Sequence, residues 1–119
     1  MLTVICNEPR SLTAVQSPIP ARQPGETLIR VKRVGVCGTD LHIFTGNQPF
    51  LEYPRVMGHE FSGIVEASDE GSGLVAGDVV YVMPYISCGT CIACSKGKTN
   101  CCTRIQVLGV HCDGAFTEY

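Results

Sequence analysis

Short apolar runs rich in β-branched residues dominate the chain, and they predict strands rather than helices. The runs are TVIC at 3–6, TLIRVKRVGVC at 27–37, FSGIVEA at 61–67, DVVYVMPYI at 78–86 and IQVLGV at 105–110. Gly, Pro, Asn or Asp residues bound them, as is typical of strands. In the second run the apolar alternation slips by one residue after Val31. We therefore expect a β-bulge or the end of the strand near Arg33 to Gly35.

Only one segment, TDLHIFTG at 39–46, has the pattern of a helix. Thr39 or Asp40 is a suitable N-cap for it, and Gly46 is a suitable end. Residues 84–104 lack periodicity and are polar and rich in cysteine, so we expect them to form an irregular lobe. The pattern as a whole predicts a mainly β, barrel-like domain that carries this lobe.

Composition and charge exclude several classes of protein. A chain of 119 residues with 45% hydrophobic and 17% charged residues is too apolar for disorder and is long enough to bury the core of one domain. A formal charge of -2 and a pI near 5.8 argue against a nucleic-acid surface. No apolar run approaches the roughly 18 residues of a membrane span, and MLTVICNEPR lacks the pattern of a secretory signal. We expect a cytoplasmic protein that binds neither nucleic acid nor membrane.

The spacing of the cysteines predicts a metal site. Five of the eight cysteines lie between positions 88 and 102. Cys88, Cys91, Cys94 and Cys102 follow the pattern C-x2-C-x2-C-x7-C, which is typical of zinc held tetrahedrally by four thiolates. Such a site has a full coordination shell, so it would stabilise the lobe and would not take part in catalysis. Spacing alone does not decide between Cys102 and its neighbour Cys101.

Four thiolates around a dication leave about two negative charges. Lys96, Lys98 and Arg104 are placed in the sequence to offset them. Three alternatives to zinc remain. Disulfides need an oxidising compartment, which no export signal indicates, and a redox CxxC pair expects a βαβ unit. C-x2-C-x2-C also begins a ferredoxin pattern, but the x3-C-P continuation is missing after Cys94, so the residues favour zinc over an iron–sulfur cluster.

A second group of metal-ligating residues lies earlier in the chain. VGVCGTDLH contains Cys37, and VMGHEFSGIV contains His59 and Glu60 between two glycines. A catalytic zinc typically has three protein ligands and one exchangeable position, and a thiolate, an imidazole and a carboxylate would supply those three. Taken singly, however, a buried free cysteine and a core histidine are the commoner explanation for Cys37 and His59.

Three motifs in order resemble the medium-chain zinc-dependent alcohol dehydrogenases, whose catalytic half is called the GroES-like domain. They are GVCGTDLH, GHEFSGIVE followed by GDVV, and CGTCIACSKGKTNCC, and together they cover nearly the full 119 residues. The stretch CGTDLHIFTGNQPF…YPRVMGHE is similar to the polyol and sugar-acid branch of that family. The resemblance implies a mainly β fold, a GroES-like, partly open β-barrel with an irregular Cys-rich zinc lobe.

The resemblance also implies roles for individual residues. Cys37 and His59 would be ligands of a catalytic zinc, and Glu60 would lie at the edge of the metal or exchange with its ligands. Asp40 would orient the His59 ring. The family's structural zinc matches Cys88, Cys91, Cys94 and Cys102, which favours Cys102 over Cys101.

The activity implied by the resemblance is oxidation of a secondary alcohol, polyol or sugar acid, with hydride transfer to NAD or NADP. Thr39 would hydrogen-bond the substrate hydroxyl, and His42 would pass its proton towards solvent. Full-length members of this kind are expected to be homo-oligomers. A non-enzymatic, zinc-stabilised β-module is the rival hypothesis, and the GTDLH and GHE motifs argue against it because a purely structural module does not need them.

Family members supply a further zinc ligand, or a carboxylate near the zinc, and a nucleotide-binding domain beyond the point that corresponds to GAFTEY. We therefore expect 1–119 to be an incomplete catalytic domain that is inactive alone. It should bind zinc in its Cys-rich lobe and hold a second zinc weakly or not at all. The segment GSGLVA at 71–76 fits a dinucleotide fingerprint, but no strand–helix context surrounds it, so we expect a turn.

Overall fold

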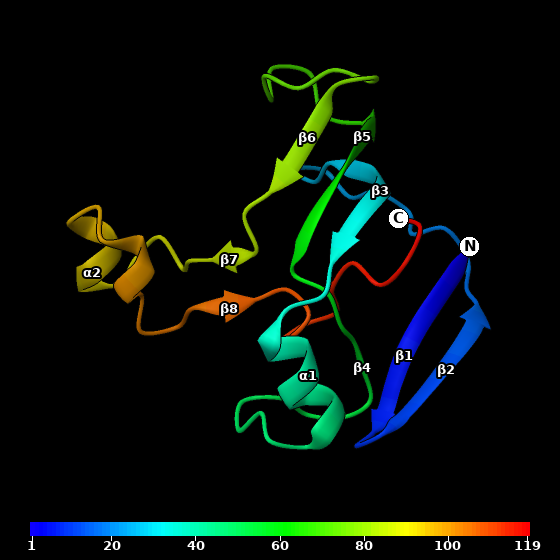
Figure 1. The fold of residues 1–119 in the computed structure, drawn as a ribbon. Coiled ribbons are helices and arrows are strands. Elements are labelled where there is room, and N and C mark those ends of the chain that lie inside the picture. Colours follow the sequence, from blue (N-terminus) through cyan, green and yellow to red (C-terminus); the bar gives the residue numbers. More distant parts are fainter.

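Eight strands and three short helical segments make up the structure, a computed structural model that describes all 119 residues (Figure 1). The strands are β1 (Leu2–Glu8), β2 (Ser11–Gln16), β3 (Leu28–Gly35), β4 (Arg55–Val56), β5 (Glu60–Ala67), β6 (Val79–Val82), β7 (Tyr85–Ile86) and β8 (Gln106–Val107). The helical segments are α1 (Gly38–Thr45), α2 (Ile92–Ser95) and a 3-10 turn, η1 (Thr99–Cys101). The predicted mainly β fold is confirmed.

The strands form three small sheets, in the orders β2-β1-β4, β3-β5-β6 and β7-β8. The last residues of the chain join the first two sheets. The Val4 amide donates to the Phe116 carbonyl at 2.8 Å, and the Val31 amide donates to the Glu118 carbonyl at 2.9 Å. The C-terminal segment therefore lies between β1 and β3 (Figure 1), and it draws the sheets into a partly open barrel.

The expected irregularity in the second apolar run is present. The pairing of β3 with β5 shifts register between Val31 and Arg33, and β3 ends at Gly35. Val31 lies opposite Gly63, where an added Cβ would come within 2.4 Å of the Arg30 carbonyl oxygen. The two strands approach so closely at this point because β5 carries no side chain there.

The N-cap of helix α1 lies two residues before Thr39, the nearer of the two expected caps. Cys37 is the N-cap, whereas Thr39 and Asp40 were the predicted ones, so that prediction is wrong. The reason is that Asp40 acts from the third helical position: its Oδ2 accepts a hydrogen bond from the Cys37 amide at 2.9 Å. Gly46 ends the helix in the left-handed conformation, with φ 83°, as predicted. The helix packs through Ile43 onto a buried cluster with Cys6, Met57 and Val110.

Several elements differ from the expected ones, and β4, α2 and η1 are among those that were not predicted. β2 was not predicted, because most of its residues are exposed and no buried alternation marks it. The run at 78–86 is divided into β6 and β7 around Pro84, which has no amide to donate to a sheet. The run at 105–110 is strand only at β8, because a turn containing Gly109 with φ 75° follows it.

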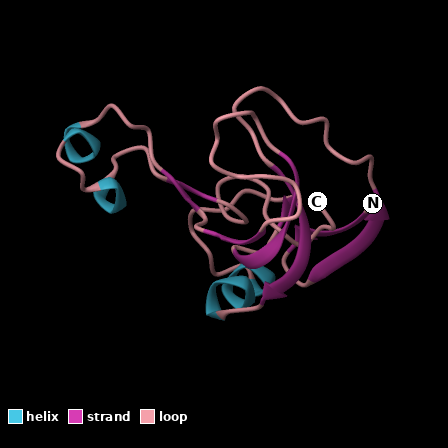
Figure 2. Cartoon of the chain, turned by 90° about the horizontal axis from the view of Figure 1, so that it is seen from above, coloured by secondary structure: helices cyan, strands magenta, loops and turns pink.

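The Cys-rich lobe stands apart from the sheets. Figure 2 shows α2 and the 3-10 turn at the end of a two-stranded stalk made by β7 and β8. Cys102 is the one buried residue between 84 and 104, so the lobe has no hydrophobic core of its own. The segment GSGLVA forms the predicted turn, and β6 follows it rather than a helix. No helix in the structure combines the length and apolar character needed to cross a membrane.

Candidate metal centres

The structure brings together the four cysteines predicted as a structural zinc site. The sulfur atoms of Cys88, Cys91, Cys94 and Cys102 all lie within 4.8 Å of one another. The Cys91 and Cys94 sulfurs are 3.5 Å apart. Two sulfurs bound to one tetrahedral zinc at about 2.3 Å each lie about 3.8 Å apart, so the group has the size that zinc requires.

Cys102 rather than Cys101 completes this group. Cys102 is 6% exposed, and its sulfur accepts hydrogen bonds from the backbone amides of Cys88 and Arg104, both at 3.3 Å. Cys101 is exposed and lies outside the group. All eight cysteines of the chain are free in the structure, so the sulfurs gather without a disulfide.

The sulfurs of the lobe ionise differently because their surroundings differ. Hydrogen bonds from the backbone amides of Thr90 and Cys91 lower the pKa of Cys88 to about 5. The pKa of Cys91 is lowered to about 7, and a hydrogen bond from the Cys94 amide is the largest cause. The pKa of Cys94 is raised to about 11, mainly because its thiol is desolvated and secondly because of the neighbouring Cys91 sulfur. Near neutral pH a cation among the sulfurs would therefore favour ionisation of Cys94, and thiolates are the donors that zinc binds.

One contributor to this site was missed in the sequence. The Thr90 hydroxyl lies 3.7 Å from the Cys88 sulfur, to which it donates, and 2.7 Å from the Nη2 of Arg104. Hydrogen bonding to the Cys88 thiolate raises the pKa of Arg104. The position of Thr90 inside the first two-residue gap of the motif was the available signal, since a side chain there starts close to both flanking sulfurs.

The second predicted group also gathers at one place. The Cys37 sulfur lies 3.0 Å from Nε2 of His59. A thiolate and an imidazole on one tetrahedral zinc would be about 3.6 Å apart, so a small outward movement of either side chain accommodates the ion. Asp40 joins them, and the ligand atoms of the three residues lie within 4.8 Å of one another.

Buried polar atoms behind this pair lack partners. Asp40 is 1% exposed, and neither its Oδ1 nor Nδ1 of His59 has a hydrogen-bond partner. The two atoms are 3.8 Å apart, beyond hydrogen-bond length but close enough to interact electrostatically. Buried polar groups are normally satisfied, so these two atoms should form a hydrogen bond once an ion on Nε2 fixes the orientation of the His59 ring. The residues fit a metal ion.

Glycines determine where His59 lies. Gly58 precedes it with φ 92°, and a Cβ on Gly58 would come within 2.5 Å of the Phe116 ring. A Cβ on Gly114 would lie 2.1 Å from the Gly58 carbonyl oxygen. The chain thus crosses itself closely just before β5 and directs His59 towards the start of α1.

The other predicted site residues lie outside this group. Glu60 is exposed at the start of β5, outside the group formed by Cys37, Asp40 and His59, and its Oε2 would contact a Cβ on Gly35 at 2.9 Å. Thr39 is partly buried and His42 is exposed. Being three residues apart on α1, these two share one face of the helix. The roles given to them remain predictions.

Comparison with known proteins identifies the family. The family model described as the alcohol dehydrogenase GroES-like domain matches residues 23–119, and the chain belongs to this family. The sequence is 49% identical over 120 residues to L-galactonate-5-dehydrogenase of Escherichia coli (strain K12), covering 100% of this chain and 35% of that protein. It is 41% identical over 120 residues to an uncharacterized zinc-type alcohol dehydrogenase-like protein of Haemophilus influenzae, covering 98% of this chain and 35% of that protein.

A solved structure agrees with this assignment. The fold superposes with a TM-score of 0.87 and 44% identity on a protein described as short chain alcohol dehydrogenase (rspB) from E. coli CFT073, complexed with the cofactor NADH. The match covers 99% of this chain and 34% of that one. The chain is thus a GroES-like domain of the medium-chain alcohol dehydrogenase family, and it spans about a third of the length of the relatives that it matches.

Proposed function

We propose that this chain is the zinc-binding catalytic portion of an oxidoreductase that oxidises a secondary alcohol, polyol or sugar acid and transfers hydride to NAD or NADP. The observation that carries the proposal is the pair formed by the Cys37 sulfur and Nε2 of His59, 3.0 Å apart beside the buried Asp40. A domain stabilised only by its lobe would have no need of this second group.

The relatives support the substrate class and the cofactor. One is named for L-galactonate, a sugar acid, and another is described in complex with NADH. We infer a small-molecule substrate with a secondary hydroxyl, a cytoplasmic location, and a homo-oligomeric full-length protein.

At the catalytic site, Cys37 as thiolate and His59 through Nε2 would hold zinc, and Glu60 would lie at its edge. A zinc ion held by these residues would supply Lewis acidity, which makes a hydroxyl group easier to deprotonate. The Asp40 carboxylate faces Nδ1 of His59 at 3.8 Å, so its charge favours the tautomer with the proton on Nδ1 and leaves Nε2 free to bind metal.

Proton removal would use the exposed side of α1. The Thr39 hydroxyl would accept a hydrogen bond from the substrate hydroxyl. His42, on the same helix face and open to solvent, would carry the proton away because an imidazole can both accept and donate one. The Cys88, Cys91, Cys94 and Cys102 site would hold its zinc for stability alone.

A chimera tests this function. Residues 1–119 replace the matching third of the E. coli L-galactonate-5-dehydrogenase, and reduction of NAD and NADP is measured with secondary alcohols, polyols and sugar acids. We expect activity that is lost in Cys37→Ser and His59→Gln, whereas Lys98→Gln, a change in the distant lobe, retains it. Circular dichroism and zinc content establish that each chimera is folded. A folded, zinc-loaded chimera that oxidises none of these substrates, or one whose activity survives Cys37→Ser, would overturn the proposal.

A further inference from the structure

We propose that Arg104 and Thr90 act as a polar clamp that closes the four-cysteine cluster and slows the loss of its metal. The inference rests on the proposed zinc site of the lobe. It concerns two residues that are not ligands, and it gives Arg104 a role that the other cations of the lobe, Lys96 and Lys98, do not have.

The clamp links the two ends of the cluster. Nη2 of Arg104 donates to the Thr90 hydroxyl at 2.7 Å, and this hydroxyl donates to the Cys88 sulfur at 3.7 Å. The backbone amide of Arg104 donates to the Cys102 sulfur at 3.3 Å. Arg104 therefore reaches the first ligand through its side chain and the last ligand through its backbone, although Thr90 and Arg104 are 14 residues apart in sequence.

The direction of the hydrogen bonds matters. An arginine donates and does not accept, so the Thr90 oxygen receives the guanidinium proton and its own proton is free to point at Cys88. Bonds arranged head to tail in this way strengthen one another. The guanidinium stays charged at every accessible pH, and it lies beside a cluster that carries about two negative charges once four thiolates hold a dication.

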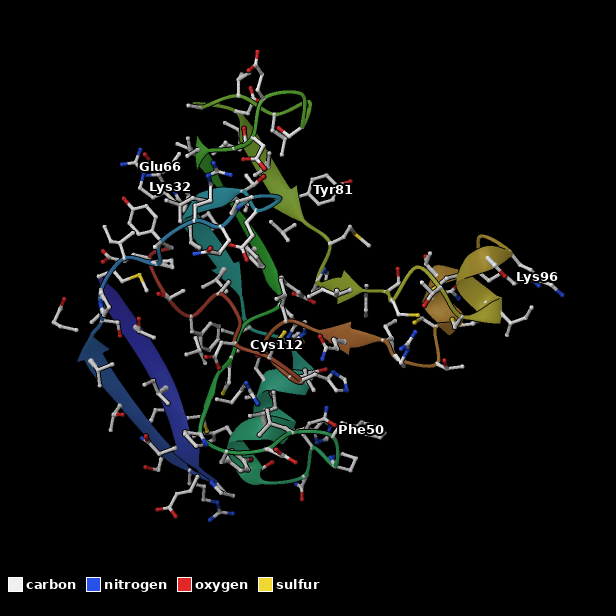
Figure 3. All side chains as sticks on the ribbon, turned by 180° about the vertical axis from the view of Figure 1, so that it is seen from behind. Lys32, Phe50, Glu66, Tyr81, Lys96 and Cys112 are labelled. Carbon is white, nitrogen blue, oxygen red and sulfur yellow. The ribbon has the colours of Figure 1, made fainter.

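The lysines of the lobe do not have these contacts. Lys96 and Lys98 are exposed, and neither side chain makes a hydrogen bond or an ion pair. Figure 3 shows the Lys96 side chain at the outer surface of the lobe. Each carries the same charge as Arg104, so they are matched controls that separate a positioned cation from a general charge effect.

The lobe depends on such polar links because it lacks apolar packing. Neither α2 nor the 3-10 turn contains a buried residue. When a lobe has no hydrophobic core, the metal and the hydrogen bonds to its ligands supply most of its order. Removing the clamp should therefore let the Cys88 end and the Cys102 end separate more often.

Zinc release from the 119-residue chain tests the clamp. All variants carry Cys37→Ser, so that zinc reports on the lobe alone, and release to a colorimetric chelator is followed in time. We expect Arg104→Gln and Thr90→Val each to speed release by about tenfold or more, since outer hydrogen bonds of this kind change metal affinity 10–100-fold. The double variant should release zinc at about the rate of the faster-releasing single variant, because the two residues act as a unit. Thr90→Ser should behave as the parent, and Lys96→Gln and Lys98→Gln should stay within about twofold of it.

A cobalt-substituted chain supplies a readout that loose packing would not change. Hydrogen bonds to a thiolate alter its donation to the metal, so the sulfur-to-cobalt charge-transfer band should shift in Arg104→Gln and Thr90→Val but not in Lys96→Gln. If the parent binds zinc through its four cysteines and Arg104→Gln releases it no faster than Lys96→Gln, the metal site stands and the clamp is refuted. If the parent binds no zinc, the metal site and the clamp fail together.

Discussion

Cys88 shows how a single residue's surroundings prepare it to bind metal. Backbone amides of Thr90 and Cys91 donate to its sulfur and lower its pKa from 9.0 to about 5. The residue types and their spacing predicted that these cysteines gather, and the family resemblance predicted Cys102 as the fourth member of the group. Spacing did not predict the role of Thr90 or the choice against Cys101, because both depend on how the chain turns within the lobe.

The ionisation of Cys88 gives a testable pH dependence. Its pKa is lower in the folded lobe than in the unfolded chain. Its thiolate therefore stabilises the metal-free lobe fully above pH 9. This stabilisation decreases as the pH falls from 9 towards about 5, and it is lost below about 5. The difference in ultraviolet thiolate absorbance between the parent and Cys88→Ser should contain a step near pH 5. A difference titration centred near pH 9 would contradict this.

Asp40 combines two functions that substitution can separate. Asp40→Ala removes the acceptor of the Cys37 amide at the start of α1 and should lower the free energy of unfolding by about 1–2 kcal/mol. Asp40→Asn keeps an oxygen acceptor, so it should lower the free energy of unfolding by less than Asp40→Ala does. Because it removes the negative charge beside His59, Asp40→Asn should still weaken metal binding by Cys37 and His59. Urea unfolding of the metal-free variants measures the first effect, and equal losses in the two variants would show that the cap bond is unimportant.

At the scale of elements, the runs of β-branched residues predicted β1, β3, β5 and β6, whereas β2 and the short β4 were not predicted. β5 has both β-branched residues and buried positions, and it was found. β2 is largely exposed, so pairing with β1 rather than its own pattern makes it a strand. Pro84 was visible in the sequence, but its effect on the run at 78–86 depends on the sheet changing partners there.

The contact between β3 and β5 depends on a glycine. A Cβ at Gly63 would meet the Arg30 carbonyl oxygen at 2.4 Å, and a backbone atom within a sheet cannot move aside easily. Gly63→Ala should therefore lower the free energy of unfolding by about 1–3 kcal/mol. Gly38→Ala is the matched control, because a Cβ there meets nothing within 4 Å and alanine favours the helix by about 0.5–1 kcal/mol. Thermal unfolding measures both, and equal stability of the two variants would be inconsistent with this packing.

At the scale of the whole molecule, the chain separates two groups of candidate metal ligands. The lobe stands away from the barrel (Figure 2), with its four sulfurs closed around one point. Cys37 immediately precedes α1 and His59 immediately precedes β5, and both residues are partly buried. Four thiolates would fill a tetrahedral coordination shell, whereas a thiolate and an imidazole would leave positions on a metal for a hydroxyl group.

The chain corresponds to 35% of the L-galactonate-5-dehydrogenase that it resembles, so we predict that these 119 residues do not reduce NAD or NADP by themselves. The purified, zinc-loaded chain is incubated with secondary alcohols, polyols and sugar acids, and the absorbance of the reduced cofactor is followed, with the E. coli enzyme as positive control. Turnover by the chain alone that depends on the alcohol would show that it needs no further domain.

The central claim is that sulfur and imidazole gather around zinc at two separate places in this fold. A crystal structure of the chain grown with excess zinc, with anomalous data collected at the zinc absorption edge, tests it most directly. The account predicts one strong peak about 2.3 Å from the sulfurs of Cys88, Cys91, Cys94 and Cys102, and a weaker peak, filled by the excess zinc, between the Cys37 sulfur and Nε2 of His59. Disulfides among the four cysteines, or Cys37 and His59 too far apart to share one peak, would contradict it.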